Sequence, residues 1–222
     1  MENLSRNENN LLKIYEIYTS IQGESSYQGL PCVFVRLSGC NLRCAWCDTA
    51  YAFFGGEEKS VDEILEEVRQ SGPLLVEITG GEPLMQHGCY DLMKKLRDEN
   101  YIVLLETGGS IDTVDVDQRV KKIIDFKAPS SLMVDENDWN NVSRLSGGDE
   151  VKFVIGDRAD YDWSLKMIKE QGLEEKTIVN LSPVHNSLKP AELVKWIMED
   201  GIDVRVNLQI HKYIWGENAV GV

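Results

Sequence analysis

Short β-rich runs alternate with amphipathic helical stretches along this chain, and no other feature of the sequence restricts the possible folds as strongly. Strands are predicted at residues 33–37, 74–79, 101–105, 123–126, 151–155, 177–181 and 204–210. Helices are predicted after the capping box that Ser60 opens, around Leu92, over residues 161–171, and from Pro190 to the stop at Gly201. Strands joined through helices form parallel pairs by right-handed crossovers. The sequence therefore predicts an α/β fold with a mostly parallel sheet covered by helices.

Polar and glycine-rich segments follow several of these predicted strands. They comprise residues 39–48, 79–83, 106–109, 125–129 and 182–185. In parallel sheets with helical crossovers, ligands and catalytic groups gather at the carboxyl ends of the strands. We therefore expect these segments to lie at one edge of the sheet and to form one site there.

One of these segments carries three closely spaced cysteines, Cys40, Cys44 and Cys47, in a C-x3-C-x2-C pattern. Soft thiolate ligands select iron–sulfur clusters, zinc or copper(I). Three thiolates are one fewer than a closed structural site uses. The spacing therefore favours a reactive iron–sulfur cluster that keeps one iron open to a small molecule.

A structural zinc site is the competing interpretation of the same cysteines. Its fourth ligand would be one of the three histidines of the chain, His87, His185 or His211. Structural zinc sites are usually built from two ligand pairs, and no second pair of the C-x2-C or H-x3-H kind is present. On this interpretation the protein would be a zinc-stapled binding module without catalytic activity.

Composition and charge exclude several classes of function. The formal net charge is -14, and a surface that acidic repels the phosphates of nucleic acids and of anionic membranes. The longest apolar runs have about the length of a strand and are too short to span a bilayer. An odd number of cysteines without an export signal indicates a location in the cytoplasm. We expect residues 1–10 to be a flexible lead-in and residues 11–222 to be a single domain that acts on small molecules.

The cysteine pattern after one strand and Gly80-Gly81-Glu82-Pro83 after the next resemble the radical S-adenosylmethionine (SAM) enzymes. The resemblance implies a partial (β/α)6-type barrel with mostly parallel strands. It also implies that a 4Fe–4S cluster is held by the three cysteines and that its open iron binds SAM, which is cleaved to a 5'-deoxyadenosyl radical. A glycyl-radical-enzyme activase, which uses the same chemistry on a partner protein, is an alternative within this superfamily.

Three further segments narrow the resemblance to the 7-carboxy-7-deazaguanine synthase family. They are residues 17–24, 44–49 and 209–215. This family converts 6-carboxy-5,6,7,8-tetrahydropterin to 7-carboxy-7-deazaguanine with release of ammonia, in the biosynthesis of queuosine or archaeosine precursors. The resemblance implies SAM and Mg²⁺ as further cofactors, an electron donor such as flavodoxin, and a homodimer. A free pterin substrate agrees with a surface that repels nucleic acid.

The resemblance also assigns roles to individual residues. It implies SAM binding by Trp46, Cys47, Asp48, Gly81, Glu82, Asp125, Phe126 and Lys127, substrate binding by Ile21, Gln22, Gly23, Glu24, Arg36 and Thr79, and Mg²⁺ binding by Thr49. His211 and Lys212 fit the tail motif of the family. At residues 125–127 many relatives have Ser-Pro-Lys, so only Lys127 matches there. In some relatives the terminal carboxylate meets the substrate, and whether Val222 does so here is open.

The chemistry of these side chains agrees with the implied roles. The amide of Gln22 suits a pterin edge that offers both donors and acceptors, and Glu24 suits the guanidine-like part of the ring. The planar fork of Arg36 suits a carboxylate. Glycines at 80 and 81 allow close approach of backbone to the methionine end of SAM, and Glu82 would meet its amino group.

Overall fold

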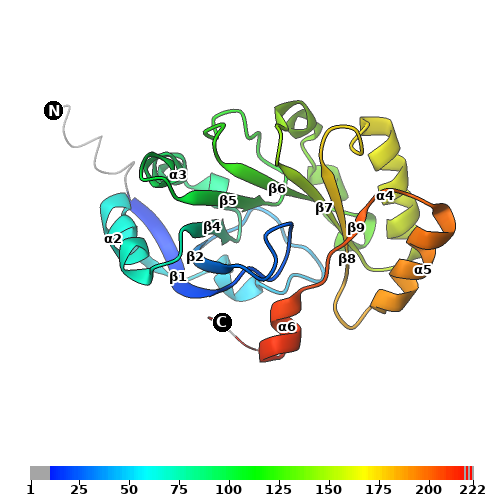
Figure 1. The fold of residues 1–222 in the computed structure, drawn as a ribbon, viewed down its shortest axis with the longest axis horizontal. Coiled ribbons are helices and arrows are strands. Elements are labelled where there is room, and N and C mark those ends of the chain that lie inside the picture. Colours follow the sequence, from blue (N-terminus) through cyan, green and yellow to red (C-terminus); the bar gives the residue numbers. More distant parts are fainter. Residues whose placement is uncertain (1–10, 218, 220, 222) are drawn as a thin grey trace.

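The computed structural model describes residues 11–217, 219 and 221, and its strands form one nine-stranded sheet (Figure 1). The strands are β1 (Leu11–Ile21), β2 (Pro31–Leu37), β3 (Glu57–Ser60), β4 (Leu75–Gly80), β5 (Ile102–Thr107), β6 (Lys121–Phe126), β7 (Glu150–Ile155), β8 (Ile178–Pro183) and β9 (Arg205–Val206). Their order across the sheet is β3-β1-β2-β4-β5-β6-β7-β8-β9. The predicted lead-in of residues 1–10 and the question of Val222 lie outside the described residues.

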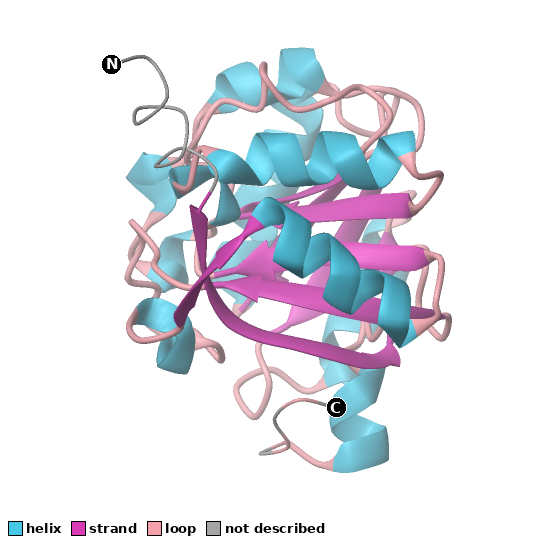
Figure 2. Cartoon of the chain, turned by 90° about the vertical axis from the view of Figure 1, so that its left-hand side faces the viewer, coloured by secondary structure: helices cyan, strands magenta, loops and turns pink. Residues whose placement is uncertain are grey.

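Helices cover one face of this curved sheet (Figure 2). They are α2 (Val61–Ser71), α3 (Gly88–Asp98), α4 (Arg158–Gln171) and α5 (Pro190–Asp200). The short α6 (Ile210–Trp215) lies apart from them, against the turn that follows β1. Short 3-10 helices span Ala50–Phe53 (η1), Pro83–Met85 (η2), Pro129–Ser131 (η3), Val134–Glu136 (η4) and Trp139–Arg144 (η5). Between β6 and β7 only 3-10 helices connect the strands, so the α/β alternation is incomplete at that point.

The two faces of the sheet differ sharply in polarity. Every second side chain of β2, β4, β5, β6, β7 and β8 packs against the helices in an apolar core, as Val35, Ile78 and Phe153 do. The alternate side chains point to the concave face and include many polar groups. They are Arg36, Glu77, Thr79, Glu106, Asp125, Lys152 and Ser182. The apolar face holds the sheet to its helices, and the concave face is left to line a site.

Most predicted elements are confirmed. All strand pairs from β2 through β9 are parallel. Helix α2 begins with the predicted capping box, in which the side chain of Ser60 accepts from the backbone of Glu63 and the Glu63 carboxylate accepts from the backbone of Ser60. Gly172 and Gly201 end α4 and α5 in the left-handed conformation that favours glycine.

Two strands were not predicted, and one predicted strand is much shorter than expected. β1 and β3 add antiparallel to the edge beside β2. β3 is short and mostly charged and gives little strand signal, whereas β1 is rich in Ile and Tyr, a strand signal that the sequence analysis did not use. The strand expected at residues 204–210 is reduced to β9. The chain leaves the sheet there because the backbone N–H of Ile210 donates to the carbonyl of Gly23 (3.0 Å), and α6 follows.

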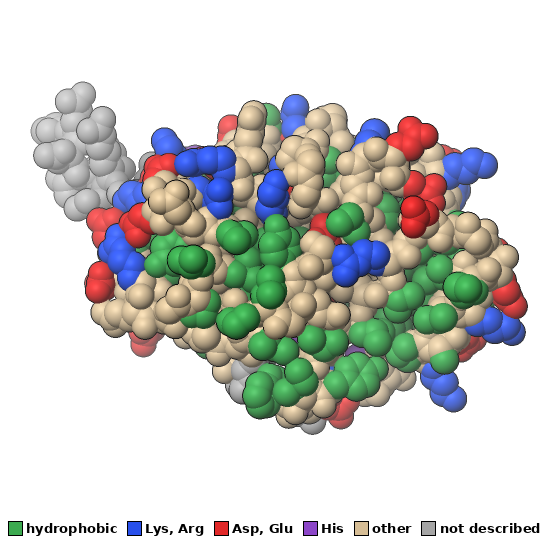
Figure 3. All heavy atoms as spheres, in the orientation of Figure 1, with side chains coloured by type: hydrophobic (Ala, Val, Ile, Leu, Met, Phe, Trp, Pro, Cys, Tyr) green, Lys and Arg blue, Asp and Glu red, His purple; other side chains and the backbone are tan. Residues whose placement is uncertain are grey.

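The surface combines charged side chains with apolar ones (Figure 3). Tyr213, Ile214 and Trp215 of α6 are each more than half exposed, and hydrophobic atoms gather at the place of this helix in Figure 3. Within the described part of the chain, none of the helices has the length and apolar character that crossing a bilayer requires.

Candidate active site

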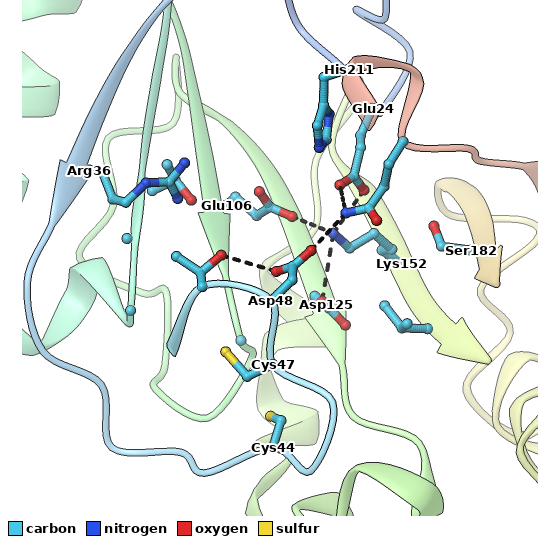
Figure 4. A pocket seen from close by; sticks show the side chains of 18 of the residues that line it. Glu24, Arg36, Cys44, Cys47, Asp48, Glu106, Asp125, Lys152, Ser182 and His211 are labelled. Atoms are coloured by element: carbon cyan, nitrogen blue, oxygen red, sulfur yellow. Dashed lines mark hydrogen bonds and ion pairs between the residues drawn. The ribbon is translucent and has the colours of Figure 1, made fainter. Parts of the chain in front are cut away.

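A cavity of about 520 Å³ opens at the carboxyl ends of the parallel strands, as the sequence predicts. Figure 4 shows Cys44 and Cys47 at one end of it, His211 at the other, and Glu106 and Lys152 between them. Fifteen of the predicted site residues line it: Ile21, Gln22, Gly23, Glu24, Arg36, Cys40, Cys44, Trp46, Cys47, Asp48, Thr49, Thr79, Gly81, Asp125 and Lys127. Glu82 and Phe126 are not among its lining residues.

The three cysteines of the pattern line one end of the cavity as free, half-buried thiols. Partial burial is the main cause that raises the pKa of Cys40, Cys44 and Cys47, and the nearby ammonium of Lys127 acts in the opposite direction. Thiols of raised pKa hold their protons, so metal binding at this loop must release protons.

The glycines after β4 are required for packing against the cysteine loop. A Cβ on Gly81 would lie 2.1 Å from the carbonyl oxygen of Gly39 and 2.8 Å from Cβ of Cys40, and a Cβ on Gly80 would lie 2.2 Å from the carbonyl oxygen of Leu37. The backbone N–H of Glu82 donates to the carbonyl of Gly39 (2.8 Å). These glycines therefore fix the position of the first cysteine, in addition to the close approach to SAM that the sequence suggests.

Glu82 lies beneath the cavity and has no exposed surface. Its carboxylate accepts from the hydroxyl of Thr107 (2.8 Å), the backbone N–H of Gly108 (2.7 Å) and that of Leu84 (3.1 Å). This geometry differs from the expectation that Glu82 meets the amino group of SAM, because its acceptor sites serve the loops after β4 and β5. Glu82 instead ties these two loops together.

The segment after β6 is divided between core and cavity. Phe126 is fully buried and stacks on Trp139 at 4.4 Å, so its side chain points away from the cavity, contrary to the expected role at SAM. Asp125 and Lys127 line the cavity and pair with each other at 3.1 Å. The second carboxylate oxygen of Asp125 is buried and has no hydrogen-bond partner among the described residues. A buried acceptor of this kind needs a donor from a ligand or from water.

Lys152 is the centre of the charge distribution in the cavity. Its ammonium lies 3.1 Å from the carboxylate of Glu24, 3.6 Å from that of Asp125, and in contact with that of Glu106. Burial alone would lower the pKa of Lys152, but these three carboxylates outweigh it and hold that pKa well above its usual range. Lys152 therefore stays charged and links Glu24, in the turn after β1, to Glu106 on β5 and Asp125 on β6.

Glu77 is buried behind the predicted pterin contact Gln22, whose side-chain amide donates to its carboxylate. Burial, reinforced by repulsion from Glu106, raises the pKa of Glu77 well above its usual range. In the native state this group therefore binds its proton more tightly than in the unfolded chain.

Replacing Glu77 by glutamine should stabilise the protein increasingly as the pH rises. The wild-type free energy of unfolding falls above about pH 4.3, the ordinary pKa of glutamate, because the unfolded chain releases this proton first. Glu77→Gln keeps an acceptor for Gln22 and removes the titration. We expect urea denaturation to show an advantage of about 1 kcal/mol near pH 7.5 that vanishes near about pH 4.5. The exposed Glu58→Gln is the control, and a difference independent of pH would contradict the prediction.

The predicted turn at Gln22 and Gly23 is completed by the far end of the chain. The backbone N–H of Ile210 donates to the carbonyl of Gly23 (3.0 Å), and Gln209 donates to the carboxylate of Glu24 (2.8 Å). A Cβ on Gly23 would lie 2.0 Å from Nδ1 of His211. Glycine is needed here because the imidazole packs directly on the backbone, which brings His211 into the cavity wall.

Arg36 points into the cavity from β2 and already has protein partners. Its Nε pairs with Glu16 at 2.7 Å, and Nη2 donates to the hydroxyl of Tyr18 at 2.9 Å. The guanidinium carbon lies 5.9 Å from the ring centres of Tyr18 and Tyr51. The side chain is mostly buried and held in one orientation, which suits recognition of a planar anion. Binding of a carboxylate by Arg36 stays a prediction.

Asp48 and Thr49 link the cysteine loop to α6. The carboxylate of Asp48 accepts from Lys212 (2.8 Å), Gln209 (3.1 Å) and the hydroxyl of Thr49 (3.0 Å). Burial raises the pKa of Asp48, but the ammonium of Lys212 and these hydrogen bonds outweigh it and hold that pKa below its usual range. The hydroxyl of Thr49 faces the cavity as a hard oxygen ligand, of the kind that Mg²⁺ prefers.

Comparison with known proteins finds relatives of the kind that the cysteine loop and its cavity suggest. Residues 34–199 match the model of the Radical SAM superfamily. The 7-carboxy-7-deazaguanine synthase of Koribacter versatilis is 46% identical over 226 residues, which cover 95% of this chain and 100% of the relative. The 7-carboxy-7-deazaguanine synthase of Chlorobaculum tepidum is 44% identical over 214 residues, which cover 95% and 97%.

This chain belongs to the 7-carboxy-7-deazaguanine synthase family. The crystal structure of QueE from Escherichia coli has the same fold, with a TM-score of 0.75 at 22% identity over 94% of this chain and 98% of that one. The expected partial barrel with mostly parallel strands is thereby confirmed.

The residues present fit the cofactors of this family, which are a 4Fe–4S cluster, SAM and Mg²⁺. Three free thiols on one loop, open to a cavity, form the donor set that an iron–sulfur cluster requires. Asp125 belongs to the lining of the same cavity, and one oxygen of its carboxylate has no hydrogen-bond partner among the described residues. The 7-carboxy-7-deazaguanine synthase family thus accounts for both the sulfur-lined end and the polar wall.

The zinc interpretation has no geometric support. Among residues 11–217, 219 and 221, no group of three His, Cys, Asp or Glu side chains could hold a single metal ion. Of the three histidines that could supply a fourth ligand, His185 already contacts the carboxylate of Glu217 at 3.0 Å. Family membership also places the glycyl-radical activase alternative behind the synthase.

Lys152 and Glu77 are site residues that the sequence analysis did not single out. Both lie in otherwise apolar strand segments, 151–155 and 74–79. A charge inside a buried strand is rare unless it is paired, so each was a signal that the strand faces a polar site on one side. The period-2 alternation of β7 and β4 shows which side chains share that face.

Proposed function

We propose that this chain is a radical SAM enzyme that converts 6-carboxy-5,6,7,8-tetrahydropterin to 7-carboxy-7-deazaguanine with release of ammonia. One observation carries the proposal: a single cavity has three free thiols at one end and Glu24 beside His211 at the other, and Gln22 and Arg36 belong to its wall. The sulfur end suits the cluster, and the polar end suits a heterocycle that bears donors, acceptors and a carboxylate. The cavity is also within the range of ordinary small-molecule sites.

The residues of the chain bind and orient the reactants, and the cofactors carry the difficult chemistry. When bound, the reduced cluster supplies the electron that cleaves SAM to a carbon radical. Glu24, fixed by Lys152, Asn207 and Gln209, presents a carboxylate to the guanidine-like edge of the pterin. Arg36 presents its guanidinium to the pterin carboxylate, and the side-chain amide of Gln22 faces the remaining edge of the pterin ring. These contacts would place carbon 6 of the pterin toward the sulfur end.

Mg²⁺ would bind at Thr49 and share its coordination shell with the substrate and with water. Support comes from the position of Thr49 on the cavity wall, two residues after the last cysteine, and from its hydroxyl beside the carboxylate of Asp48. We propose Thr49→Val and Thr49→Ser as a matched pair. The serine variant should keep the Mg²⁺ stimulation of the rate, and the valine variant should lose it.

Four further features are proposed, the first two from the family and the others from the cysteines and the sheet. An external reductant such as flavodoxin would deliver the electron, and two copies would form a homodimer. Five free cysteines agree with a reducing cytoplasm as the place of action. One sheet that runs through all nine strands supports a single domain over residues 11–222.

The test is an anaerobic assay of the full chain after reconstitution with iron and sulfide. Carboxytetrahydropterin, SAM and dithionite are supplied with and without Mg²⁺, and 7-carboxy-7-deazaguanine and 5'-deoxyadenosine are measured. Formation of both in comparable amounts supports the proposal. Iron uptake and SAM cleavage without a deazapurine would leave a radical SAM enzyme of another specificity and end this assignment.

Replacing Gly23 by alanine tests the polar end of the cavity separately. The new Cβ would displace His211, which otherwise lies 2.0 Å from that position, and would loosen the docking of α6 on the pterin turn. We expect the KM for the pterin to rise roughly tenfold because a small misplacement of binding groups has large effects, with the KM for SAM within about twofold. Gly147→Ala, where no atom lies within 4 Å, is the control. Equal changes in both KM values would contradict this division of the cavity.

A further inference from the structure

We propose that Ser130 and Asp160 are positioning residues that hold the turn of residues 44–47 and thereby set the affinity for SAM. This inference rests on the proposed function, since it concerns the SAM end of the same cavity. Neither residue lines the cavity. Ser130 belongs to η3 and Asp160 to the first turn of α4, both outside the cysteine loop.

Two hydrogen bonds attach the turn of residues 44–47 to η3. The indole Nε1–H of Trp46 donates to Oγ of Ser130 (3.0 Å), and the backbone N–H of Ala45 donates to the carbonyl of Ser131 (3.0 Å). Side chain and backbone therefore fix the short stretch between the second and third cysteines. Cys44, Trp46 and Cys47 all line the cavity, so a shift of this turn would move the cavity wall.

Asp160 holds Ser130 in place. Its side chain is almost completely buried and accepts from the backbone N–H of Ser130 (2.8 Å), that of Gly156 (2.8 Å), and the hydroxyl of Ser130. A hydroxyl has one proton to donate, and here the carboxylate takes it. The lone pairs of Oγ are then directed to the indole N–H of Trp46. The hydrogen-bond order Trp46 to Ser130 to Asp160 follows from this donor count.

The hydrogen-bonded series Trp46–Ser130–Asp160, called the relay below, leaves no room for a side chain at residue 156. A Cβ on Gly156 would lie 2.7 Å from Oγ of Ser130 and 3.1 Å from the carboxylate of Asp160. The distance to Ser130 is too short for a real Cβ and the distance to Asp160 is tight, so a side chain at residue 156 would shift the Ser130 hydroxyl. A local backbone requirement of this kind indicates that the position of the Ser130 hydroxyl matters.

The consequence concerns SAM more than the pterin. The relay reaches the cysteine loop at Trp46, which lies at the sulfur end, whereas Gln22 and Glu24 are held by other elements. Loss of the Ser130 hydroxyl frees the indole and loosens the turn without touching the polar end. Binding of SAM should therefore weaken, while the pterin and the chemical step keep their contacts.

The first arm of the test follows the Trp46 indole directly. The full chain, labelled with ¹⁵N at its indoles and free of metal, is compared with Ser130→Ala, and Trp46→Phe identifies the Trp46 signal. We expect Ser130→Ala to shift this signal alone and to speed its hydrogen exchange by about tenfold, the loss of about one hydrogen bond. Gly156→Ala should shift the same signal, because the new Cβ would displace the Ser130 hydroxyl that accepts from the indole. An unchanged Trp46 signal in both variants overturns the proposal.

The second arm measures SAM binding to the holoenzyme. SAM is titrated against the electron paramagnetic resonance signal of the reduced cluster, and kcat and both KM values are determined. Ser130→Ala and Asp160→Asn should raise the Kd and KM for SAM by roughly fivefold, with kcat and the pterin KM within about twofold. Ser143→Ala, a serine in η5 that contacts a local carbonyl, and Asp135→Asn, an exposed aspartate in η4, are the controls.

The outcomes separate this inference from the proposed function. Unchanged SAM affinity in both relay variants, or a loss confined to kcat, overturns the positioning role even in an active synthase. If the wild type forms no deazapurine but binds SAM, the function fails, and the SAM titration still decides the role of Ser130 and Asp160.

Discussion

Replacing Cys44 by alanine should abolish cluster binding and lower product formation by at least about a thousandfold, because SAM cleavage requires the cluster. Cys40, Cys44 and Cys47 line one end of the cavity, and two thiolates cannot replace three. Iron and sulfide content after anaerobic reconstitution, together with 5'-deoxyadenosine formation, measures the effect. We expect both to fall to background in this variant.

The chain provides a matched control for this experiment in Cys32. It is also a free cysteine, but it is fully buried in the small core cluster with Phe34 and Leu75. Cys32→Ala removes one sulfur from the protein and leaves the loop intact, so iron content and activity should stay near wild type. Full cluster content in Cys44→Ala would end the assignment of the loop as the cluster site.

Replacing Lys152 by methionine should lower the free energy of unfolding by about 3 kcal/mol or more at neutral pH. Three carboxylates, those of Glu24, Glu106 and Asp125, then face one another without their shared ammonium, and uncompensated buried charges are strongly destabilising. We also expect loss of product formation, because Glu24 and Asp125 both line the binding cavity and would move when Lys152 no longer holds them.

The pH dependence identifies the cause of this loss. The raised pKa of Lys152 means that its contribution to wild-type stability is complete below about 10.4, the ordinary pKa of lysine, and is lost only as the pH rises through the folded value. In Lys152→Met the carboxylates repel, so protonation at about pH 5 should restore part of the stability. Urea denaturation at about pH 5 and pH 7.5 measures this, with the exposed Lys94→Met as control. An equal loss at both pH values would indicate a packing defect instead of unpaired charge.

The sequence allowed most of the architecture to be predicted because its local signals agree with the fold. The capping box at Ser60, the proline at position 190 and the glycines at 172 and 201 mark helix ends that form as expected. Fifteen predicted site residues line one cavity because loops at the carboxyl ends of parallel strands must meet at one edge.

What could not be predicted depends on long-range contacts. The chain turns away from the sheet after β9 because residues 207–210 find partners in the turn at Gly23 and Ser25, which a local pattern does not show. The same holds for Glu82 and Phe126: each stands beside a residue that lines the cavity, but Glu82 is bonded to the loop after β5 and Phe126 stacks on Trp139. The sequence spacing placed Glu82 and Phe126 at the correct edge of the sheet, but it could not show which way their side chains point.

The docking of residues 207–211 on the turn at Gln22–Ser25 has a consequence for biosynthesis. The backbone N–H of Ser25 donates to the side chain of Asn207 (3.0 Å), and Gln28 donates to the carbonyl of Leu208 (2.7 Å). Chains are made from the amino terminus and their parts can fold as they emerge from the ribosome. The cysteine loop is thus synthesised long before the wall that recognises the heterocycle can close. The wall of the cavity beside Gly23 and Glu24 is therefore complete only after residues 207–211 have been made.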